Sequence, residues 1–265
     1  MNRYIFYRIT SSVNQKPRLD HFSKLDCLES LLAAFPNYRV VCVADNCDQA
    51  TFDLLQKRHF YKLIRTNLGN AASFNYLLNH ELILLKDSDL LYFAEDDYLY
   101  REGASDALEE GLEIFDYVTL YDHPDKYSDF SAQINPLVCK GMLSEVTQVS
   151  QGKKCLWRTT NSTTMTFGCI VKTIRKDFPV WNLLTQYYSI PRDFYIWILL
   201  TCPQRNFFTS RLNLSMVLLL SNVFSILRGK RLLAVAVPSF SAHLEQNMLP
   251  KNFDTDFAFN SRLQA

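Results

Sequence analysis

Glycine, paired cysteines and an excess of either charge are what this sequence lacks. Only 7 of its 265 residues are glycine, so glycine-rich loops that bind phosphate are scarce. The 7 cysteines are an odd number, and even the nearest two, Cys42 and Cys47, do not have the spacing of a zinc site. We therefore expect neither a zinc site nor a disulfide framework. The formal net charge of +1 gives no general attraction to nucleic acid, which is not expected as a partner.

The N-terminus also lacks the uninterrupted apolar run of a signal peptide, so we expect a cytoplasmic protein. One later segment, residues 212–227, is mostly apolar and is followed by Arg228, Lys230 and Arg231. It is shorter than the roughly 20 residues of a membrane span, and polar residues interrupt it. A buried helix is the preferred interpretation of this segment. A helix that makes peripheral contact with a membrane surface is the alternative.

The first hundred residues alternate between strand and helix patterns. Runs of apolar and β-branched residues predict four strands, and apolar residues at helical spacing predict the helices between them. The expected strands are 4–9, 39–44, 61–65 and 90–94, and the expected helices are 22–35, 49–59 and 71–84. This rhythm predicts an α/β fold with a mostly parallel, Rossmann-like central sheet flanked by helices. Right-handed crossovers then place the carboxyl ends of the strands along one edge, where ligands of such sheets bind.

The pattern is less regular in the rest of the chain. The expected helices there are 106–115, 179–188 and 194–201, and the expected strands are 117–121, 156–160, 165–171 and 232–237. We interpret 156–160 and 165–171 as a hairpin pair, and the polar stretch 122–135 as a loop. The composition is 48% hydrophobic, which is ample for one core, so the chain is expected to form a single domain.

Acidic residues follow two of the expected strands on the ligand edge. Asp45 comes directly after 39–44, and Glu95, Asp96 and Asp97 come directly after 90–94. Adjacent carboxylates repel one another, and burying them without a neutralising partner is costly. A divalent cation is the natural partner, because Mg²⁺ and Mn²⁺ prefer carboxylate oxygens and keep positions open for phosphate. A solvated acidic turn is the alternative interpretation.

Residues 91–98 (LYFAEDDY) resemble the strand and DxD element of GT-A glycosyltransferases, especially inverting enzymes of family 2. The resemblance implies that Asp97 binds Mn²⁺ or Mg²⁺, which bridges the diphosphate of a nucleotide-sugar. Glu95 or Asp96 would then contact the ribose or the water shell of the metal. Which of these two stands for the first acidic residue of the motif is left open, because glutamate occupies the position where aspartate is usual.

Other parts of the chain are similar to further elements of that family. Asp45 is similar to the carboxylate that binds the nucleotide base, and residues 65–75 (RTNLGNAASFN) resemble the element beside the nucleotide and the diphosphate. Arg65 would offset phosphate charge, and the helix start near Gly69 would present N–H donors. Arg8 and Asn70 are assigned to substrate and nucleotide binding as well. The alternative is that the polar residues of 65–75 only cap a helix.

Two isolated positions in the second half complete the resemblance. Asp193, at the start of an expected helix, matches the base that deprotonates the acceptor hydroxyl in inverting enzymes. Its alternative role is a first-turn carboxylate that favours the helix dipole, and Asp177 is a weaker candidate for the base. His243, after the last expected strand, resembles the C-terminal histidine that is a further metal ligand in many GT-A enzymes.

The resemblance implies one GT-A domain over 1–265, with a nucleotide-sugar-binding half (1–127) and an acceptor-binding half with a C-terminal tail (128–265). The implied reaction moves a sugar from a nucleoside-diphosphate sugar to a hydroxyl of a glycan or glycoconjugate, with inversion. A UDP-sugar is the first expectation for the donor, with GDP- and dTDP-sugars as alternatives. A sugar-1-phosphate nucleotidyltransferase usually needs a glycine-rich loop after the first strand, and residues 11–16 have no glycine. A non-catalytic nucleotide-sugar-binding protein is the remaining alternative.

Overall fold

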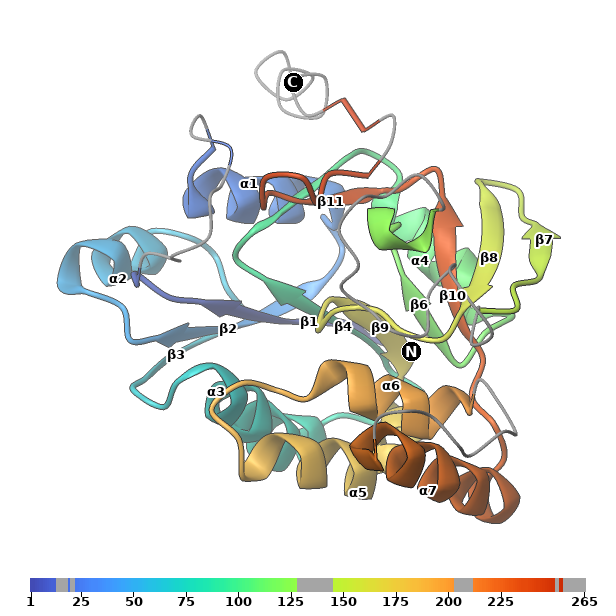
Figure 1. Ribbon diagram of the computed structural model, residues 1–265. Helices are drawn as coiled ribbons and strands as arrows, with labels where there is room; N and C mark the ends of the chain where they lie inside the picture. The colour runs from blue at the N-terminus through green and yellow to red at the C-terminus, as the bar shows by residue number, and fades with distance from the viewer. Residues whose placement is uncertain (13–18, 20–21, 128–144, 203–211, 251–252, 255–265) are drawn as a thin grey trace.

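A nine-stranded β-sheet with helices on both faces organises the part of the chain that the structure describes (Figure 1). This computed structural model describes residues 1–12, 19, 22–127, 145–202, 212–250 and 253–254. The strands lie in the order β3-β2-β1-β4-β9-β6-β10-β8-β7. Their bounds are β1 (Arg3–Ile9), β2 (Arg39–Asp45), β3 (Lys62–Thr66), β4 (Leu90–Glu95), β6 (Tyr117–Thr119), β7 (Val149–Gln151), β8 (Leu156–Thr160), β9 (Phe167–Ile170) and β10 (Leu233–Val237).

The first half of the chain folds as its pattern predicts. The strands β3, β2, β1 and β4 are parallel neighbours. The helices between them are α1 (Lys24–Ala34), α2 (Gln49–Gln56) and α3 (Asn70–Tyr76), and α3 continues through a π turn (Leu77–Glu81) into a 3₁₀ turn (Leu82–Leu84). The predicted α/β fold, with a mostly parallel central sheet flanked by helices, is therefore confirmed.

The second half of the sheet is mixed, and the expected hairpin of 156–160 and 165–171 is wrong. β9 lies antiparallel between β4 and β6, whereas β8 lies antiparallel between β10 and β7. The strand Phe167–Ile170 is almost entirely buried, and a central position suits such a strand. Its Gly168 faces α4 (Ala104–Leu112) so closely that a Cβ there would lie 2.5 Å from Leu108 Cδ1. The position of β9 in the sheet therefore follows from the burial of its side chains, and its nearness to β8 in the sequence does not make the two strands pair.

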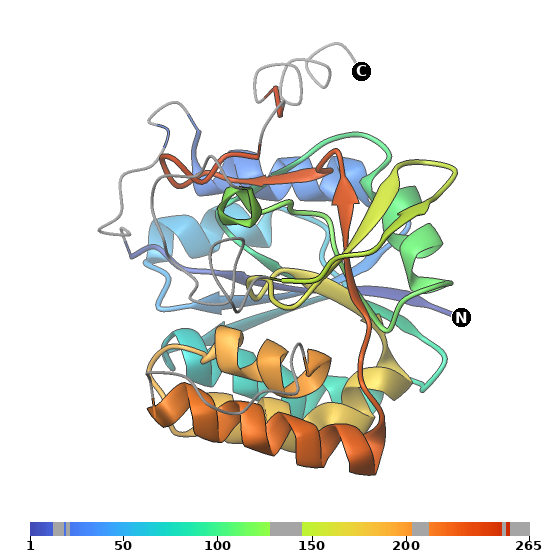
Figure 2. The same ribbon diagram turned by 45° about the vertical axis from the view of Figure 1, so that its right-hand side comes forward.

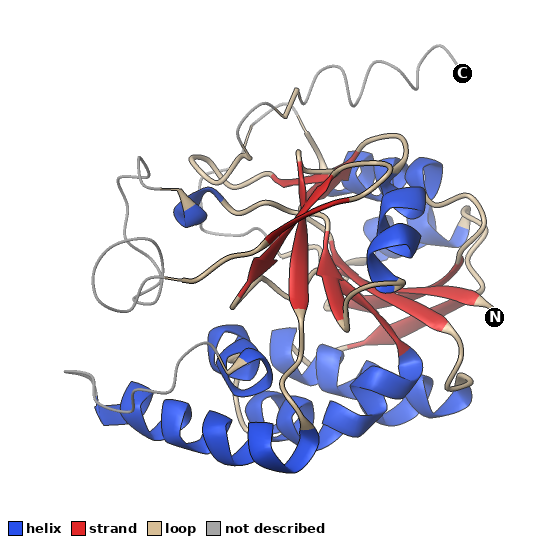
Figure 3. Ribbon diagram, turned by 90° about the vertical axis from the view of Figure 1, so that its right-hand side faces the viewer, coloured by secondary structure: helices blue, strands red, loops and turns tan. Residues whose placement is uncertain are grey.

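Alternating side chains of the strands build a hydrophobic core on each face of the sheet. In β1, Ile5 and Tyr7 belong to the cluster that includes Leu28 of α1, while Tyr4 and Phe6 belong to the cluster on the opposite face. Figure 3 shows the strands between the two layers of helices. The lower layer in Figure 1 contains α3, α5 (Val171–Gln186), α6 (Asp193–Thr201) and α7 (Leu212–Arg228).

The helix expected at 179–188 begins eight residues earlier, at Val171, and contains Pro179 in its interior. Proline favours the first turn of a helix, and for this reason the pattern suggested a start there. The structure instead buries Val171 and Ile174 ahead of the proline and Trp181 after it. Packing of this continuous face compensates for the backbone hydrogen bond that proline cannot make.

The expectation that 212–227 forms a buried helix is wrong for one side of α7. Leu218 and Ser221 are buried, but six apolar side chains are exposed. They are Met216, Leu219, Leu220, Val223, Ile226 and Leu227. Figure 2 shows α7 as the lowest helix of its layer, beneath α6. Among the described residues, we find no helix with the length and apolar character to cross a membrane.

A small second sheet, which the sequence pattern did not predict, joins two distant segments. β5 (Tyr98–Tyr100) pairs antiparallel with β11 (Ser241–His243), so that His243 lies opposite Tyr98. The strand expected at 117–121 ends at Thr119, and a 3₁₀ turn (Pro124–Lys126) follows it. The rest of the expected loop, 128–135, lies outside the described residues. The small sheet fixes the segment after β10 beside the acidic end of β4.

Candidate functional site

A pocket of about 220 Å³ opens where β1, β2 and β4 end beside the start of α3. Six of the nine residues that the sequence assigned to the site line this pocket, namely Arg8, Asp45, Asn70, Glu95, Asp96 and Asp97. Arg65, Asp193 and His243 are not among its lining residues. The predicted ligand edge of the sheet therefore carries a cavity, and it carries most of the predicted polar groups.

Arg8 forms the buried centre of the pocket. The parallel pairing of β1 with β4 places it opposite Glu95, and its Nη2 donates to Glu95 Oε1 at 2.8 Å. Its Nη1 donates to the backbone oxygen of Asn70 at 2.6 Å and to Asn70 Oδ1 at 2.8 Å. Only 8% of Arg8 is exposed. The guanidinium therefore neutralises Glu95 and ties β4 to the first turn of α3.

Asp96 is held by the protein itself. Its Oδ2 accepts from the backbone N–H of Thr10 at 2.9 Å and lies 2.8 Å from Lys24 Nζ. Lys24 also donates to the backbone oxygen of Thr10 at 2.6 Å. These contacts join the end of β1 to α1 and neutralise the carboxylate. Contact of Asp96 with a ribose or a metal-bound water stays a prediction.

Asp97 and His243 meet although 146 positions separate them in the sequence. Asp97 Oδ2 lies 3.2 Å from His243 Nε2, and the backbone N–H of Leu244 donates to the Asp97 carbonyl at 2.9 Å. The imidazole stacks on the ring of Tyr98 with centroids 4.9 Å apart. Glu245 Oε2 lies 3.8 Å from His243 Nδ1. The small sheet thus brings a histidine between two carboxylates at the end of β4.

Negative charge accumulates around this pair. Burial raises the pKa of Glu95 to about 7, and the charges of Asp97 and Asp193 add to the increase while Arg8 opposes it. Burial and the charge of Asp97 also raise the pKa of Asp96. Burial lowers the pKa of His243, but the nearby carboxylates, Asp97 first, outweigh it and raise the value above the ordinary one. Burial is the first cause for the two acids, and the charge of Asp97 contributes in the same direction to all three shifts.

The contact of Asp97 with His243 is within hydrogen-bond distance, and it is also an ion pair when the imidazole is protonated. Carboxylate and imidazole are both groups that can bind a divalent cation. Among the described residues, no group of three or more His, Cys, Asp or Glu side chains is arranged to hold a metal ion. A cation held by this pair would need its remaining ligands from outside these side chains, and binding of Mn²⁺ or Mg²⁺ stays a prediction.

Asp45 fastens the loop between β3 and α3. Its Oδ1 accepts from Thr66 Oγ1 at 2.8 Å and from the N–H of Leu68 at 2.7 Å. Its Oδ2 accepts from Asn46 Nδ2 at 2.7 Å and from the N–H of Gly69 at 2.9 Å. Four protein donors thus occupy the carboxylate, which has a structural role whether or not it also contacts a nucleotide base.

The same contacts limit the expectation for the start of α3. The N–H groups of Leu68 and Gly69 donate to Asp45, and that of Ala71 donates to the backbone oxygen of Ser189 at 3.2 Å. These three donors are therefore already used inside the protein. Presentation of the other N–H groups of this turn to a phosphate stays a prediction.

Arg65 lies away from the pocket. Its Nη1 donates to Gln49 Oε1 at 2.8 Å, its Nη2 donates to the backbone oxygen of Cys47 at 3.2 Å, and its guanidinium lies over the ring of Phe52. These partners belong to α2 and to the turn before it. The structure does not bring Arg65 together with the other predicted site residues.

Asp193 is the first residue of α6, and its Oδ1 accepts from the N–H of Phe194 at 2.7 Å. Its charge contributes to the raised pKa of Glu95, so it lies within electrostatic reach of the site. The competing candidate, Asp177, is buried and accepts from Arg231 at 2.8 and 2.9 Å and from Tyr117 at 2.9 Å. Asp177 is therefore a structural partner of Arg231, and Asp193 stays the candidate base.

Sequence reasoning missed Lys24 and Glu245. Glu245 follows His243 by two positions, and alternation along a strand would have suggested that the two share a face. No local signal marks Lys24, because its partner Asp96 is 72 positions away and only the fold brings them together.

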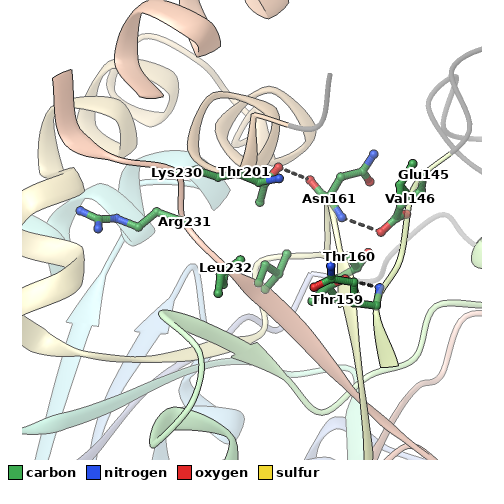
Figure 4. Close-up of a pocket in the computed structure, with 11 residues that line it drawn as sticks. Glu145, Val146, Thr159, Thr160, Asn161, Thr201, Lys230, Arg231 and Leu232 are labelled. Atoms are coloured by element: carbon green, nitrogen blue, oxygen red, sulfur yellow. Dashed lines mark hydrogen bonds between the residues drawn. The ribbon is translucent and has the colours of Figure 1, made fainter. Parts of the chain in front are cut away.

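A second pocket, of about 190 Å³, lies between the end of β8 and the start of β10 (Figure 4). Its polar groups are bonded to one another. Thr201 Oγ1 donates to the backbone oxygen of Asn161 at 3.1 Å, and Glu145 Oε1 accepts from the N–H of Asn161 at 2.6 Å. It gathers one acidic side chain, Glu145, so the pocket at the ends of β1, β2 and β4 is the stronger candidate.

No protein-family model matches the chain, and no curated protein matches its sequence. Among solved structures, it is similar to residues 1–349 of TarS from S. aureus, with a TM-score of 0.45 and 12% identity over 75% of this chain and 54% of that one. It is also similar to the galactosyltransferase LgtC (TM-score 0.39, 12% identity, 74% and 69%). A third similarity is to the inositol-1-phosphate CTP transferase of T. maritima (TM-score 0.42, 12% identity, 99% and 96%). The chain spans about half of the TarS fragment, and the other two proteins transfer different groups, so these matches do not decide between sugar and nucleotidyl transfer.

Proposed function

We propose that this protein transfers a sugar from a nucleoside-diphosphate sugar, a UDP-sugar first, to an acceptor hydroxyl with the help of Mn²⁺ or Mg²⁺. The observation that supports this most is the contact of Asp97 Oδ2 with His243 Nε2 at 3.2 Å, beside the pocket at the strand ends. The pair fits a cation whose other ligands are phosphate oxygens. The surrounding negative charge favours a bound cation and disfavours a diphosphate that binds without one.

Each side chain has a distinct part in the proposed reaction. Asp97 and His243 would hold the cation, which would supply stabilisation of the negative charge on the departing diphosphate. Arg8 keeps Glu95 neutralised and positions the first turn of α3 at the pocket wall. Asp193 would accept the proton of the acceptor hydroxyl as its oxygen bonds to C1 of the sugar and the bond from C1 to the diphosphate breaks. Attack from the face opposite the leaving group gives inversion.

The variant Asp193→Asn separates chemistry from binding. We expect its turnover to fall by about 10²- to 10⁴-fold, the usual contribution of a general base, while its affinity for UDP in the presence of Mn²⁺ stays that of the wild type. Release of UDP from UDP-sugars measures the first quantity, and titration calorimetry measures the second. Normal turnover of the variant would end the assignment of Asp193 as the base.

The cation requirement has its own test. Calorimetry with UDP, GDP and dTDP, each with Mn²⁺, with Mg²⁺ and with a chelator, should show binding of at least one nucleotide only when a cation is present. If none of the three binds under any condition, the proposed function is wrong. Release of pyrophosphate from a nucleoside triphosphate and a sugar phosphate would instead support the nucleotidyltransferase alternative.

A further inference from the structure

The outer side of α7 carries an apolar stripe, which we define as Met216, Leu219, Leu220, Val223, Ile226 and Leu227. Their exposed fractions run from 46% to 83%. The spacing of three and four residues places all six on one side of the helix, over a length of about 17 Å. Among the described side chains of α7, every exposed one belongs to this stripe.

The inner side of α7 is firmly packed. Leu218 is buried with Ile198 of α6, in a cluster that Phe194, Tyr195 and Val217 complete. Ser221 is buried, and its hydroxyl donates to the backbone oxygen of Leu218 at 2.8 Å. A surface helix normally turns its polar residues outward and its apolar ones inward. In α7 a buried serine faces inward and an unbroken row of aliphatic side chains faces outward.

The segment that contains α7 carries no acidic residue. The sequence has no aspartate or glutamate from position 194 to position 244, and Arg228, Lys230 and Arg231 stand at and just after the end of α7. Arg228 and Arg231 face the carboxylates of Asp177 and Asp116, so Lys230 is the basic residue of this group that has no acidic partner among the described residues. Lys230 is exposed. The first half of α5 lies beside the end of α7, because Asp177 approaches Arg228 to 4.0 Å, and Lys176, the residue before Asp177, is exposed. An anionic surface would therefore meet exposed lysines at this end of the stripe and no acidic side chain from α7.

The composition of the stripe favours lipid over protein. Interfaces between proteins are rich in tryptophan, tyrosine and arginine at their energetic centres, and leucine and valine are under-represented there. The stripe contains only aliphatic side chains and one methionine. An apolar helix face next to basic residues is typical of helices that lie in the plane of an anionic bilayer surface. We propose that α7 binds an anionic membrane surface through this stripe, with Lys176 and Lys230 near the lipid headgroups.

Vesicle flotation tests the proposal without any assay of sugar transfer. The full chain should float with vesicles of phosphatidylcholine and phosphatidylglycerol, and more weakly with phosphatidylcholine alone, because both apolar burial and charge contribute. The double variant Ile226→Gln and Leu227→Gln should bind the mixed vesicles at least about tenfold more weakly. Circular dichroism and thermal unfolding establish that the variant is folded.

The matched control is the pair Val149→Gln and Leu156→Gln. These side chains are also exposed, at 63% and 46%, but lie in β7 and β8 at the edge of the large sheet. The control should bind vesicles like the wild type. Failure of the wild type to float, or equal losses in both double variants, would overturn the proposal. A third result would also overturn it. If sedimentation velocity shows that the wild type is a dimer, that the dimer does not bind vesicles and that the α7 variant is a monomer, then a second copy of the chain covers the stripe.

Discussion

Asp45 and Asp97 stand at comparable places, each at or just after the end of a buried parallel strand, yet the fold uses them differently. Asp45 accepts hydrogen bonds from four donors in its own strand end and the neighbouring loop. Asp97 faces the imidazole of His243, which arrives from a distant strand. An acidic residue after a strand is therefore not by itself a sign of a ligand site. The donors that the fold brings to it decide whether it holds a loop or binds a ligand.

Within this comparison, the largest expected effect is on Asp97. The variant Asp97→Asn should weaken binding of UDP in the presence of Mn²⁺ by about 100-fold, because it removes a charged ligand of the proposed cation. Its free energy of unfolding should fall by no more than about 1 kcal/mol, the usual contribution of one hydrogen bond. Calorimetry and urea denaturation measure the two quantities.

Asp106→Asn is the control for Asp97, since it removes the same charge from an exposed side chain and should leave UDP binding unchanged. A marked loss of stability in Asp97→Asn with unaltered UDP affinity would contradict the distinction between Asp97 and Asp45.

Asp45 should show the reverse behaviour. The variant Asp45→Ala leaves the N–H groups of Leu68 and Gly69 without their acceptor, and we expect the free energy of unfolding to fall by about 2–3 kcal/mol. Urea denaturation monitored by fluorescence gives this value. If the variant is as stable as the wild type and loses only nucleotide affinity, then Asp45 binds the nucleotide base and does not stabilise the loop between β3 and α3.

Lys24 gives the smallest effect and extends the comparison to Asp96. The variant Lys24→Met removes the cation from a carboxylate side chain that is only 10% exposed, and should lower the free energy of unfolding by about 1–2 kcal/mol. Lys154→Met is the control, because its pair with Asp106 is exposed on both sides and should contribute less than about 0.5 kcal/mol. Equal losses in the two variants would show that Asp96 is not specially held.

The sequence predicts the parallel half of the sheet well because each strand there is a continuous apolar run between clear helical patterns. The small sheet of β5 and β11 escapes prediction, since three residues carry no measurable period. The sequence also does not predict which strands pair with β8 and β9, because this pairing depends on which strand faces are buried by helices distant in the sequence. The exposed apolar stripe of α7 was not predicted for a similar reason. The sequence of an apolar segment is the same whether another part of the protein covers its outer face or not.

Six of the nine predicted site residues line one pocket and His243 contacts Asp97, whereas Arg65 lies apart for a simple reason. Successive side chains of a strand point to opposite faces, so a residue one position away from the right one faces the wrong way. In β3 it is Thr66 whose hydroxyl reaches Asp45, while the preceding Arg65 turns toward Gln49 and Phe52. Asp97 and His243 were predicted from a resemblance, and the pairing of β5 with β11 explains how they meet.

The position of β10 has a consequence for synthesis of the protein on the ribosome. This strand comes late in the chain but lies between β6 and β8, and it pairs with both. Until residues 233–237 have left the exit tunnel, those two strands present unpaired edges, which are prone to association with other chains. A nascent chain interrupted before this point would therefore lack both the strand that joins β6 to β8 and the histidine that faces Asp97.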